Sequence, residues 1–454
     1  MAVTDYRGIA DAVAADIAAG VLHPGERLPP QRDFAYARGI AVSTASRVYA
    51  ELARRGLVLG EVGRGTYIRS DLGAAEPIQA EPPPSALDLQ RTMSRLPEQE
   101  ALLAETLAGL GRHAVEAALT LYGPAGTPQA RATAARFLAR RGFAPDPGGI
   151  LFTGNGRQGL AAALAALAPP GERIGCEPLT YPVIKGIAAR LGIALVPLAV
   201  DREGVRPEAV LQAHRAAPLR GLYLQPTLQN PLGLTMGPQR RAEIAALLAE
   251  TGLVAVEDAV YGFLRDADPI AALAPEHAIL VDSLSKRVMP GLTIGMIVSP
   301  LRWVDRLAAS VRQGGWSAQG LALAAGTRWM GDGSADRLAL AKRRDAAERQ
   351  ALARERLAGL TVTGDDAAYH LWLELPETWR AEAYAAAALR RGIALIPAAA
   401  FAVSPGHAPN AVRLALATPS RDDLARALDT LRHLALAGED WARDGLAGDD
   451  QMVE

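Results

Sequence analysis

Short apolar segments alternate with helical patterns through the middle of the chain, and this alternation constrains the fold most strongly. The predicted strands are "GILFT" (149–153), "ALVPLAV" (194–200), "GLYLQP" (221–226), "LVAVED" (253–258) and "AILVDS" (278–283). Helices are predicted between them, for example at 157–168 and 238–250. Strands that alternate with helices form βαβ units, so we expect an α/β domain with a mostly parallel sheet and a smaller α+β part at its C-terminal end.

Length, composition and charge limit the class of protein. The chain has 454 residues, half of them hydrophobic, which is long enough for more than one domain. It has no apolar run of about 18 residues and no signal-peptide pattern at its N-terminus, so we expect a cytoplasmic protein. The single Cys176 excludes an internal disulfide, and no residue cluster has metal-ligand spacing. Because the net charge is −1, any nucleic-acid binding must come from a local patch.

The first 70 residues predict a winged helix-turn-helix domain. Helical patterns cover residues 6–20, 31–38 and 43–56, and Ser43 is the predicted N-cap of the third helix. The strands "LVLGEV" and "TYI" follow, joined by the turn "GRG". In this arrangement the second helix of the motif enters the major groove of DNA, and the strand pair forms the wing.

The third helix has two different faces. Ala45, Val48, Tyr49 and Leu52 form an apolar face, whereas Thr44, Arg47 and Glu51 are predicted to lie on another. Arg32 begins the second helix and Arg64 lies at the tip of the wing. Arginine suits contacts with both phosphate and guanine, so these positions are candidates for DNA binding.

The stretch "GERLPPQRDFA…GIAVSTASRVYAELARRGLVLGEVGRGTYI" resembles the DNA-binding domain of the GntR family. The resemblance rests on the "G-x-x-L-P" turn, the "V-S-x-x-x-x-R-x-Y-x-E-L" helix and the "G-x-G-T" wing. It implies that double-stranded DNA is a partner. The DNA contacts that it implies are Arg32, Ser43, Thr44, Arg47, Arg64 and Gly65.

The motif "GNGRQG" (154–159) is compatible with a dinucleotide and also with another cofactor that carries a phosphate. It satisfies G-x-G-x-x-G after a predicted strand, and Glu177 stands about twenty residues on, as the ribose carboxylate of a dinucleotide-binding protein does. However, any turn that opens a helix after a strand can hold a phosphate on its free N–H groups. The motif therefore predicts a phosphate site more strongly than it predicts a dinucleotide.

Polar residues that follow four predicted strands favour pyridoxal phosphate. They are Tyr181 in "EPLTYP", Asn230 in "QPTLQNPLG", Asp258 and Tyr261 in "EDAVYGF", and Lys286 in "SLSK". Ligands bind at the carboxyl ends of strands in α/β folds. A lysine can join pyridoxal phosphate covalently, a carboxylate keeps the pyridine nitrogen protonated, and an amide and a phenol can bind the ring oxygen.

Residues 115–435 resemble fold-type I aminotransferases. The segment "YGPAGTPQARATAARFLARRG" is similar to their "Y-G-x-x-G-x-x-x-L-R" motif, although Ala130 replaces the leucine. The resemblance implies Gly156 and Arg157 at the cofactor phosphate, Tyr181 on the ring face, Asn230 and Tyr261 at O3′, Asp258 at the pyridine nitrogen, Lys286 as the covalent lysine beside Ser283 and Ser285, Tyr122 at the phosphate of the partner subunit, and Arg413 at a substrate carboxylate.

The combination of both parts resembles the MocR subfamily of GntR-type regulators. It implies a GntR-type domain at residues 1–70, a Pro-rich linker at 71–90, an aminotransferase-like effector domain at 91–436 and an acidic tail at 437–454. It further implies a head-to-tail homodimer in the cytoplasm, associated with the bacterial nucleoid while it is bound to DNA.

One position departs from the family pattern. Relatives carry arginine seven residues after the lysine, where it pairs with the cofactor phosphate, and this chain has Thr293. A threonine gives one neutral hydrogen bond in place of a charge-assisted pair. Arg157 and Arg287 are the two candidates to supply the missing charge, and we favour Arg157.

The predicted function is that of a regulator that binds pyridoxal phosphate and senses an amino compound or the vitamin itself. An active aminotransferase is the alternative, because the same residues allow turnover. A dehydrogenase is a third reading, which rests on the glycine motif alone. The sequence names neither the effector nor the operator.

Overall fold

The computed structural model describes residues 6–18, 21–22, 26–54, 57–61, 65–68, 86–140, 142–404 and 408–444. The chain divides into one unit of Met1–Ala80 with Gly192–Ala194, and a second unit of Glu81–Leu191 with Leu195–Glu454. The predicted wing residue Arg64, most of the predicted linker and the last ten residues lie outside the described ranges. No helix among the described residues has the length and apolar character that spanning a membrane requires.

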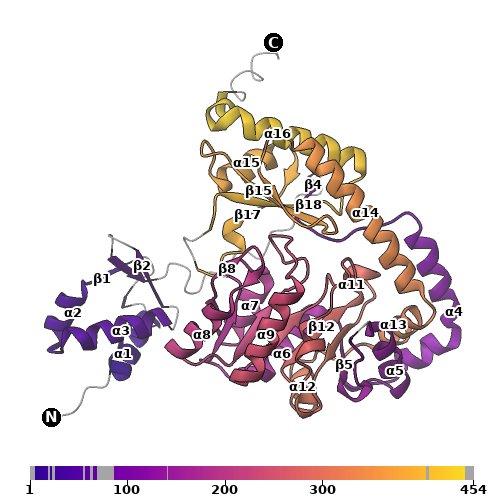
Figure 1. Ribbon diagram of the computed structural model, residues 1–454, viewed down its shortest axis with the longest axis horizontal. Coiled ribbons are helices and arrows are strands. Elements are labelled where there is room, and N and C mark those ends of the chain that lie inside the picture. Colours follow the sequence, from indigo (N-terminus) through magenta and orange to yellow (C-terminus); the bar gives the residue numbers. More distant parts are fainter. Residues whose placement is uncertain are drawn as a thin grey trace. The chain divides into compact units, whose positions relative to one another are not determined.

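The described residues of the first unit form three helices and a three-stranded antiparallel sheet (Figure 1). Its elements are α1 (Tyr6–Ala18), β1 (Arg27–Leu28), α2 (Gln31–Arg38), α3 (Val42–Arg54), β2 (Val58–Glu61) and β3 (Gly65–Ile68). The three helices and the two wing strands are as the sequence predicts, and β1 is an addition. Val48 and Leu52 of α3 are fully buried, so the predicted apolar face is confirmed. Tyr49 packs edge-on against Phe34 at 5.2 Å and donates a hydrogen bond to the carbonyl of Pro29, which ties α3 to α2 and to the turn before it.

Two details of α3 differ from the prediction. The helix begins at Val42, and the amides of Thr44 and Ala45 both donate to the carbonyl of Ala41, so Ser43 lies inside the first turn and is not the N-cap. Glu51 was predicted on the polar face but is only 7% exposed. The apolar face of α3 is therefore wider than the sequence pattern indicated.

A seven-stranded sheet forms the centre of the second unit, in the order β5-β13-β12-β11-β10-β6-β7 (Figure 1). Its strands are β5 (Ile150–Thr153), β6 (Arg173–Cys176), β7 (Ala194–Pro197), β10 (Gly221–Leu224), β11 (Val254–Asp258), β12 (Ala278–Ser283) and β13 (Gly295–Val298). β6, β10, β11 and β12 pair in parallel, while β13 runs antiparallel to β12 and to β5. The mostly parallel sheet is confirmed, and β6 and β13 are additions to the predicted strands.

Helix α6 (Gly156–Leu167) covers the sheet with its apolar face and packs on β5, β11, β12 and β13. Its close approach depends on Gly159, since a Cβ built there would lie 2.9 Å from Val281 and 3.3 Å from Thr153. Asn155 caps the helix by accepting from the amide of Gln158 at 3.0 Å. The packing of α6 places the amides of its first turn at the carboxyl end of β5.

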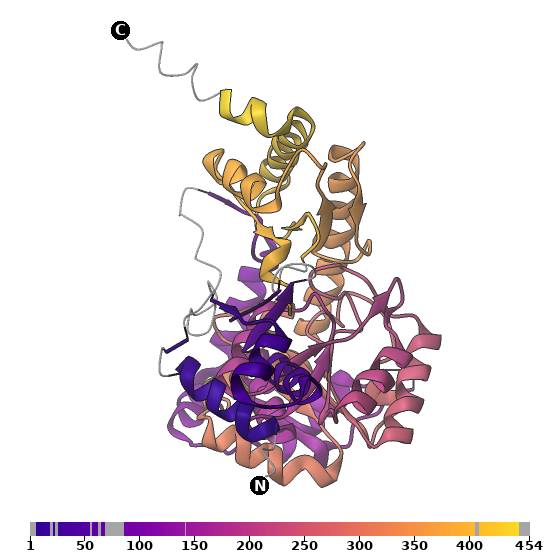
Figure 2. The same ribbon diagram turned by 90° about the vertical axis from the view of Figure 1, so that its left-hand side faces the viewer.

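The C-terminal part of the second unit is a four-stranded sheet covered by helices. The sheet order is β14-β15-β18-β17, formed by β14 (Val362–Thr363), β15 (His370–Glu374), β17 (Ile396–Pro397) and β18 (Ala411–Ala415). The long helices α14 (Ser334–Arg356) and α16 (Arg421–Asp444) lie side by side in both views (Figures 1 and 2). β4 (Leu87–Asp88) pairs in parallel with β16 (Ile393–Ala394), so the chain that follows the predicted linker is bound to this part.

Candidate cofactor site

Lys286 lies on the short helix α11 (Leu284–Arg287), which follows β12 directly at its carboxyl end. Its amine donates to the hydroxyl of Thr92 at 2.7 Å and lies 4.6 Å from the ring centre of Tyr261. The hydroxyl of Thr92 is also 2.8 Å from that of Tyr261. Within the described residues no carboxylate forms an ion pair with Lys286, so its amine is held by neutral groups only.

Asp258 ends β11 and is almost fully buried. One carboxylate oxygen accepts from Tyr223 at 2.8 Å and from the amide of Gln225 at 3.0 Å, and the other accepts from the backbone of Val260. Burial raises the pKa of Asp258 to about 6, although the hydrogen bonds from Tyr223 and Val260 and the charge of Lys286 act in the opposite direction. A protonated ring nitrogen would supply the opposite charge that this buried carboxylate lacks.

Arg413 on β18 and Asn230 are brought together from distant parts of the chain. The guanidinium donates to the side-chain oxygen of Asn230 at 3.1 Å and also to the backbone carbonyl of Gln90. Arg413 is 3% exposed, its Nε has no hydrogen-bond partner, and burial lowers its pKa. A buried cation that has only neutral acceptors is suited to receive an anion such as a carboxylate.

A row of hydroxyl groups lies against the N-terminus of α6. The hydroxyls of Ser283 and Ser285 are 2.8 Å apart, and the hydroxyl of Thr293 is 3.1 Å from that of Ser285. A Cβ on Gly156 would meet Ser283 at 3.1 Å, so the glycine allows the helix to approach this row. Hydroxyls beside the free amides of a helix N-terminus are typical of a phosphate site, and these residues fit the phosphate of pyridoxal phosphate.

The two arginines considered as substitutes for the missing phosphate contact are in different environments. Arg287 is buried, pairs with Asp282 at 2.8 Å and lies over the rings of Phe137 and Phe263. It is therefore already neutralised. Arg157 is exposed in the first turn of α6, and its Nε donates to the hydroxyl of Tyr181 at 2.9 Å. Only Arg157 keeps guanidinium N–H groups near the helix N-terminus, which favours it as the compensating charge.

The remaining predicted residues lie elsewhere. Tyr122 is half-buried against the large core. In the first unit, Arg32, Ser43 and Arg47 are exposed, whereas Thr44 is half-buried. Arg47 lies 4.3 Å from the ring centre of Tyr6, so this arginine is stacked on an aromatic ring. None of these positions gains an assigned role from the structure, and their roles stay predictions.

Several residues near the site were not predicted. His370 of β15 is fully buried, its ring centre lies 5.3 Å from that of Tyr261, and its Nε2 is 3.0 Å from the carbonyl of Gln229. Burial, followed by the charge of Arg413, lowers the pKa of His370 to about 3, so it is neutral. Lys342 of α14 donates to the carbonyl of Lys286 at 2.8 Å, and burial lowers its pKa to about 8. No local pattern in the sequence marks either residue.

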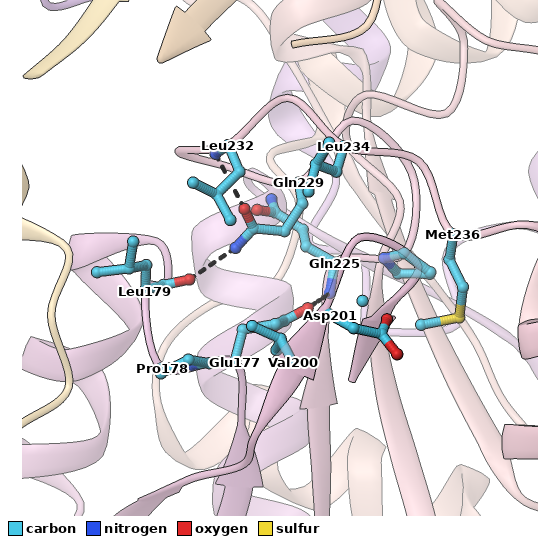
Figure 3. A pocket seen from close by; sticks show the side chains of 12 residues that line it. Glu177, Pro178, Leu179, Val200, Asp201, Gln225, Gln229, Leu232, Leu234 and Met236 are labelled. Atoms are coloured by element: carbon cyan, nitrogen blue, oxygen red, sulfur yellow. Dashed lines mark hydrogen bonds between the residues drawn. The ribbon is translucent and has the colours of Figure 1, made fainter. Parts of the chain in front are cut away.

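Glu177 does not serve a dinucleotide. Its carboxylate accepts from the backbone amide of Gln225 at 2.8 Å beside a cavity of about 70 Å³, and Gln229 bonds to Leu179 and Leu232 across the same cavity (Figure 3). Burial raises the pKa of Glu177 to about 7. In addition, β5 lies at the sheet edge, whereas the first strand of a Rossmann fold is central. The dehydrogenase reading is therefore wrong.

Comparison with known proteins agrees with this geometry. The model of the family described as aminotransferase class I and II matches residues 91–431, and that of bacterial regulatory proteins of the gntR family matches residues 5–68. The uncharacterized HTH-type transcriptional regulator YdeF of Bacillus subtilis is 29% identical and covers 94% of both chains.

Two more relatives and one solved structure are informative. The pyridoxine biosynthesis transcriptional regulator PdxR of Corynebacterium glutamicum is 27% identical over 63% of each chain. The vitamin B6 salvage pathway transcriptional repressor PtsJ of Salmonella typhimurium is 27% identical over 64% of this chain and 66% of its own. The α-aminoadipate aminotransferase LysN of Thermus thermophilus has a TM-score of 0.71 at 23% identity, covering 78% of this chain and 93% of its own, which shows the shared fold.

Proposed function

We propose that pyridoxal phosphate and a carboxylate-bearing amine control the binding of this protein to DNA. The premise is that the chain belongs to the aminotransferase class I and II family and also carries a gntR-family domain, which together are the architecture of a MocR-type transcriptional regulator. One observation carries the proposal. The amine of Lys286 and the guanidinium of Arg413 are both buried or half-buried cations without a carboxylate partner among the described residues. The guanidinium of Arg413 could bind the carboxylate of an amino acid, and the amine of Lys286 could bind the carbonyl group of the cofactor.

Different residues of the site would hold different parts of the cofactor. Gly156, the serine and threonine hydroxyls and Arg157 would hold the phosphate, and Asp258 would hold the ring nitrogen. When bound, pyridoxal phosphate supplies an aldehyde that condenses with an amine and a ring that withdraws electrons. Tyr223 and Gln225 fix the carboxylate of Asp258 in place, and Asn230 orients Arg413.

We further propose that the regulator is a homodimer, cytoplasmic and associated with the nucleoid while bound to DNA. Helix α4 (Gln99–Leu119) and the residues after it expose Val115, Leu119 and Leu121 by 61%, 84% and 98%. Apolar side chains exposed next to one another are typical of a subunit interface. Tyr122 follows them directly, which supports its predicted role at the phosphate of the partner subunit.

A visible absorbance spectrum tests the cofactor. Adding pyridoxal phosphate should produce a band near roughly 420 nm, because the Lys286 amine condenses with the aldehyde. Lys286→Arg keeps the positive charge but cannot condense, so it should lose the band. Lys185→Arg, on α7 (Pro182–Arg190), is the matched control and should keep it. A band of equal strength in Lys286→Arg would contradict the proposal.

The regulatory part is tested by DNA binding. Fluorescence anisotropy with DNA from the upstream region of the protein's own gene should show an affinity that changes when amino acids are added to the cofactor-loaded protein. An effect is possible only if the ligand prefers one arrangement of the protein. Steady turnover of an amino acid with a keto acid, with no change in DNA affinity, would instead identify an aminotransferase.

A further inference from the structure

Residues Asp88–Ser94 contact several residues of the site, and we refer to them as the strap. At the start of the strap, the amide of Leu89 donates to the carbonyl of Ala394 at 2.9 Å, and the carbonyl of Leu89 accepts from Ala415 at 2.8 Å. Leu89, Thr92 and Ser94 are buried, although this stretch belongs to no long strand or helix. The strap is therefore held by specific contacts and not by a regular ladder of hydrogen bonds.

Two strap residues bind the groups that the proposed ligands require, and a third binds Lys342 beside them. The carbonyl of Gln90 accepts from Arg413. The hydroxyl of Thr92 accepts from Lys286 at 2.7 Å and lies 2.8 Å from the hydroxyl of Tyr261. The carbonyl of Ser94 accepts from Lys342 at 3.2 Å, and Lys342 also holds the carbonyl of Lys286.

Two of these contacts, those of Gln90 and Thr92, compete with a ligand for the same donor. A carboxylate binds a guanidinium through two parallel hydrogen bonds, so it needs the N–H that Arg413 gives to Gln90. Likewise, the amine of Lys286 must be deprotonated and turned toward a carbonyl carbon before it can condense, which breaks its bond to Thr92. A carbonyl and a hydroxyl are weaker partners of a cation than a carboxylate is, so the strap can be displaced.

We propose that the strap is an internal competitor of the ligand, with Thr92 as the residue that determines how readily Lys286 and Arg413 become available. This inference rests on the proposed function for the identity of the ligand, an amine that also bears a carboxylate. The strap overlaps the end of the predicted linker at residues 88–90. Its release therefore changes the anchoring of the chain at the point where the linker enters the second unit.

Hydrogen–deuterium exchange of the full chain tests the strap without relying on any ligand. In Thr92→Val the side chain keeps its shape but cannot accept from Lys286, so the amides of residues 87–95 should exchange about tenfold faster than in the parent. Thr92→Ser keeps the hydroxyl and should match the parent. The peptides that contain β11 and β12 report on global stability and should exchange equally in all three proteins.

Ligand titration gives the second measurement. Acetate, which can occupy Arg413 without any cofactor, should speed exchange of residues 87–95 in the parent, and pyridoxal phosphate should bind Thr92→Val about tenfold more tightly because Lys286 is released. Equal exchange rates of residues 87–95 in the valine and serine variants, or weaker cofactor binding by the valine variant, would contradict the proposal that the strap competes with the ligand. Absence of the 420 nm band in the parent, with the valine variant still exchanging faster, would overturn the proposed cofactor and leave the strap standing.

Discussion

Asp258 makes the stability of the ligand-free protein depend on pH. Its pKa is raised to about 6 in the folded state, whereas an unfolded aspartate titrates near 4, so the folded protein binds the proton more tightly between these values. The contribution of Asp258 to the free energy of unfolding is therefore largest below about pH 4. It falls by about a few kcal/mol as the pH rises toward 6.

The substitution Asp258→Asn should remove this dependence and also weaken cofactor binding. Urea unfolding of both proteins between about pH 4 and 7 measures the slope, with Asp365→Asn, a carboxylate outside the site, as the control. Glu177 has its pKa raised to about 7 and adds a slope of the same sign, which the variant retains. An unchanged slope in Asp258→Asn would show that this carboxyl group is not the one that titrates.

Arg413 is expected to be irreplaceable by lysine. An ammonium carries the same charge but lacks the planar fork that binds a carboxylate by two hydrogen bonds. Arg413→Lys should therefore weaken binding of a carboxylate-bearing effector by about 10- to 100-fold while cofactor binding changes little. Isothermal titration of the cofactor-loaded protein with the effector gives the first affinity, and titration of the cofactor-free protein with pyridoxal phosphate gives the second. Equal effector affinity in the two proteins would place the carboxylate elsewhere.

The sequence indicates where single residues of the candidate site lie relative to the strands, but it does not indicate which residues reach them from distant segments. Asp258 ends an apolar strand, and Lys286 and Asn230 each follow one, so the local pattern indicated their place. Thr92 and His370 enter through pairings between segments 169 and 141 residues apart, for which the sequence has no local signal. Arg287 could not be distinguished from Arg157 until its pairing with Asp282 was known.

At the scale of elements, two glycines within helices allow the effect of packing on stability to be distinguished from the effect of helix propensity. Gly159 of α6 faces β12, and a Cβ there would lie 2.9 Å from Val281. Gly186 of α7 has nothing within 4 Å of such a Cβ. Gly159→Ala should therefore lower stability by about 1–3 kcal/mol, because it pushes α6 from the sheet, and Gly186→Ala should raise it by about 1 kcal/mol through helix propensity.

Chemical denaturation of both variants measures these changes. If Gly159→Ala also weakens cofactor binding while Gly186→Ala does not, then the position of α6 controls the phosphate site. Equal stability of the two alanine variants would show that α6 can move without cost.

The prediction of strands by apolar runs succeeded for β5, β10, β11 and β12, since all are fully buried. The edge of α3 at Ser43 was misplaced because a backbone carbonyl, that of Ala41, accepts its first bonds.

For the whole molecule, the exposed Leu119 at the end of α4 and the exposed Leu121 after it predict a subunit interface. Leu121→Glu should convert a dimer into a monomer, because it places a charge in an apolar contact. Leu273→Glu, at another exposed leucine, is the control and should leave the dimer intact. Sedimentation measures the mass, and the monomer should lose affinity for paired half-sites because each subunit then binds alone. A dimeric Leu121→Glu variant would place the interface elsewhere.

The scarcity of lysine has a practical consequence for labelling. The chain contains only Lys185, Lys286 and Lys342, none of them is exposed, and each donates a hydrogen bond to a carbonyl or hydroxyl oxygen. Amine-directed reagents therefore find few competing targets on this protein. Cleavage after lysine divides the unmodified chain into only four peptides. A lysine that carries a reductively trapped group is not cleaved, so the one fused peptide in the mass spectrum identifies the modified amine. The chain thus carries its own nearly background-free chemical reporter for the site.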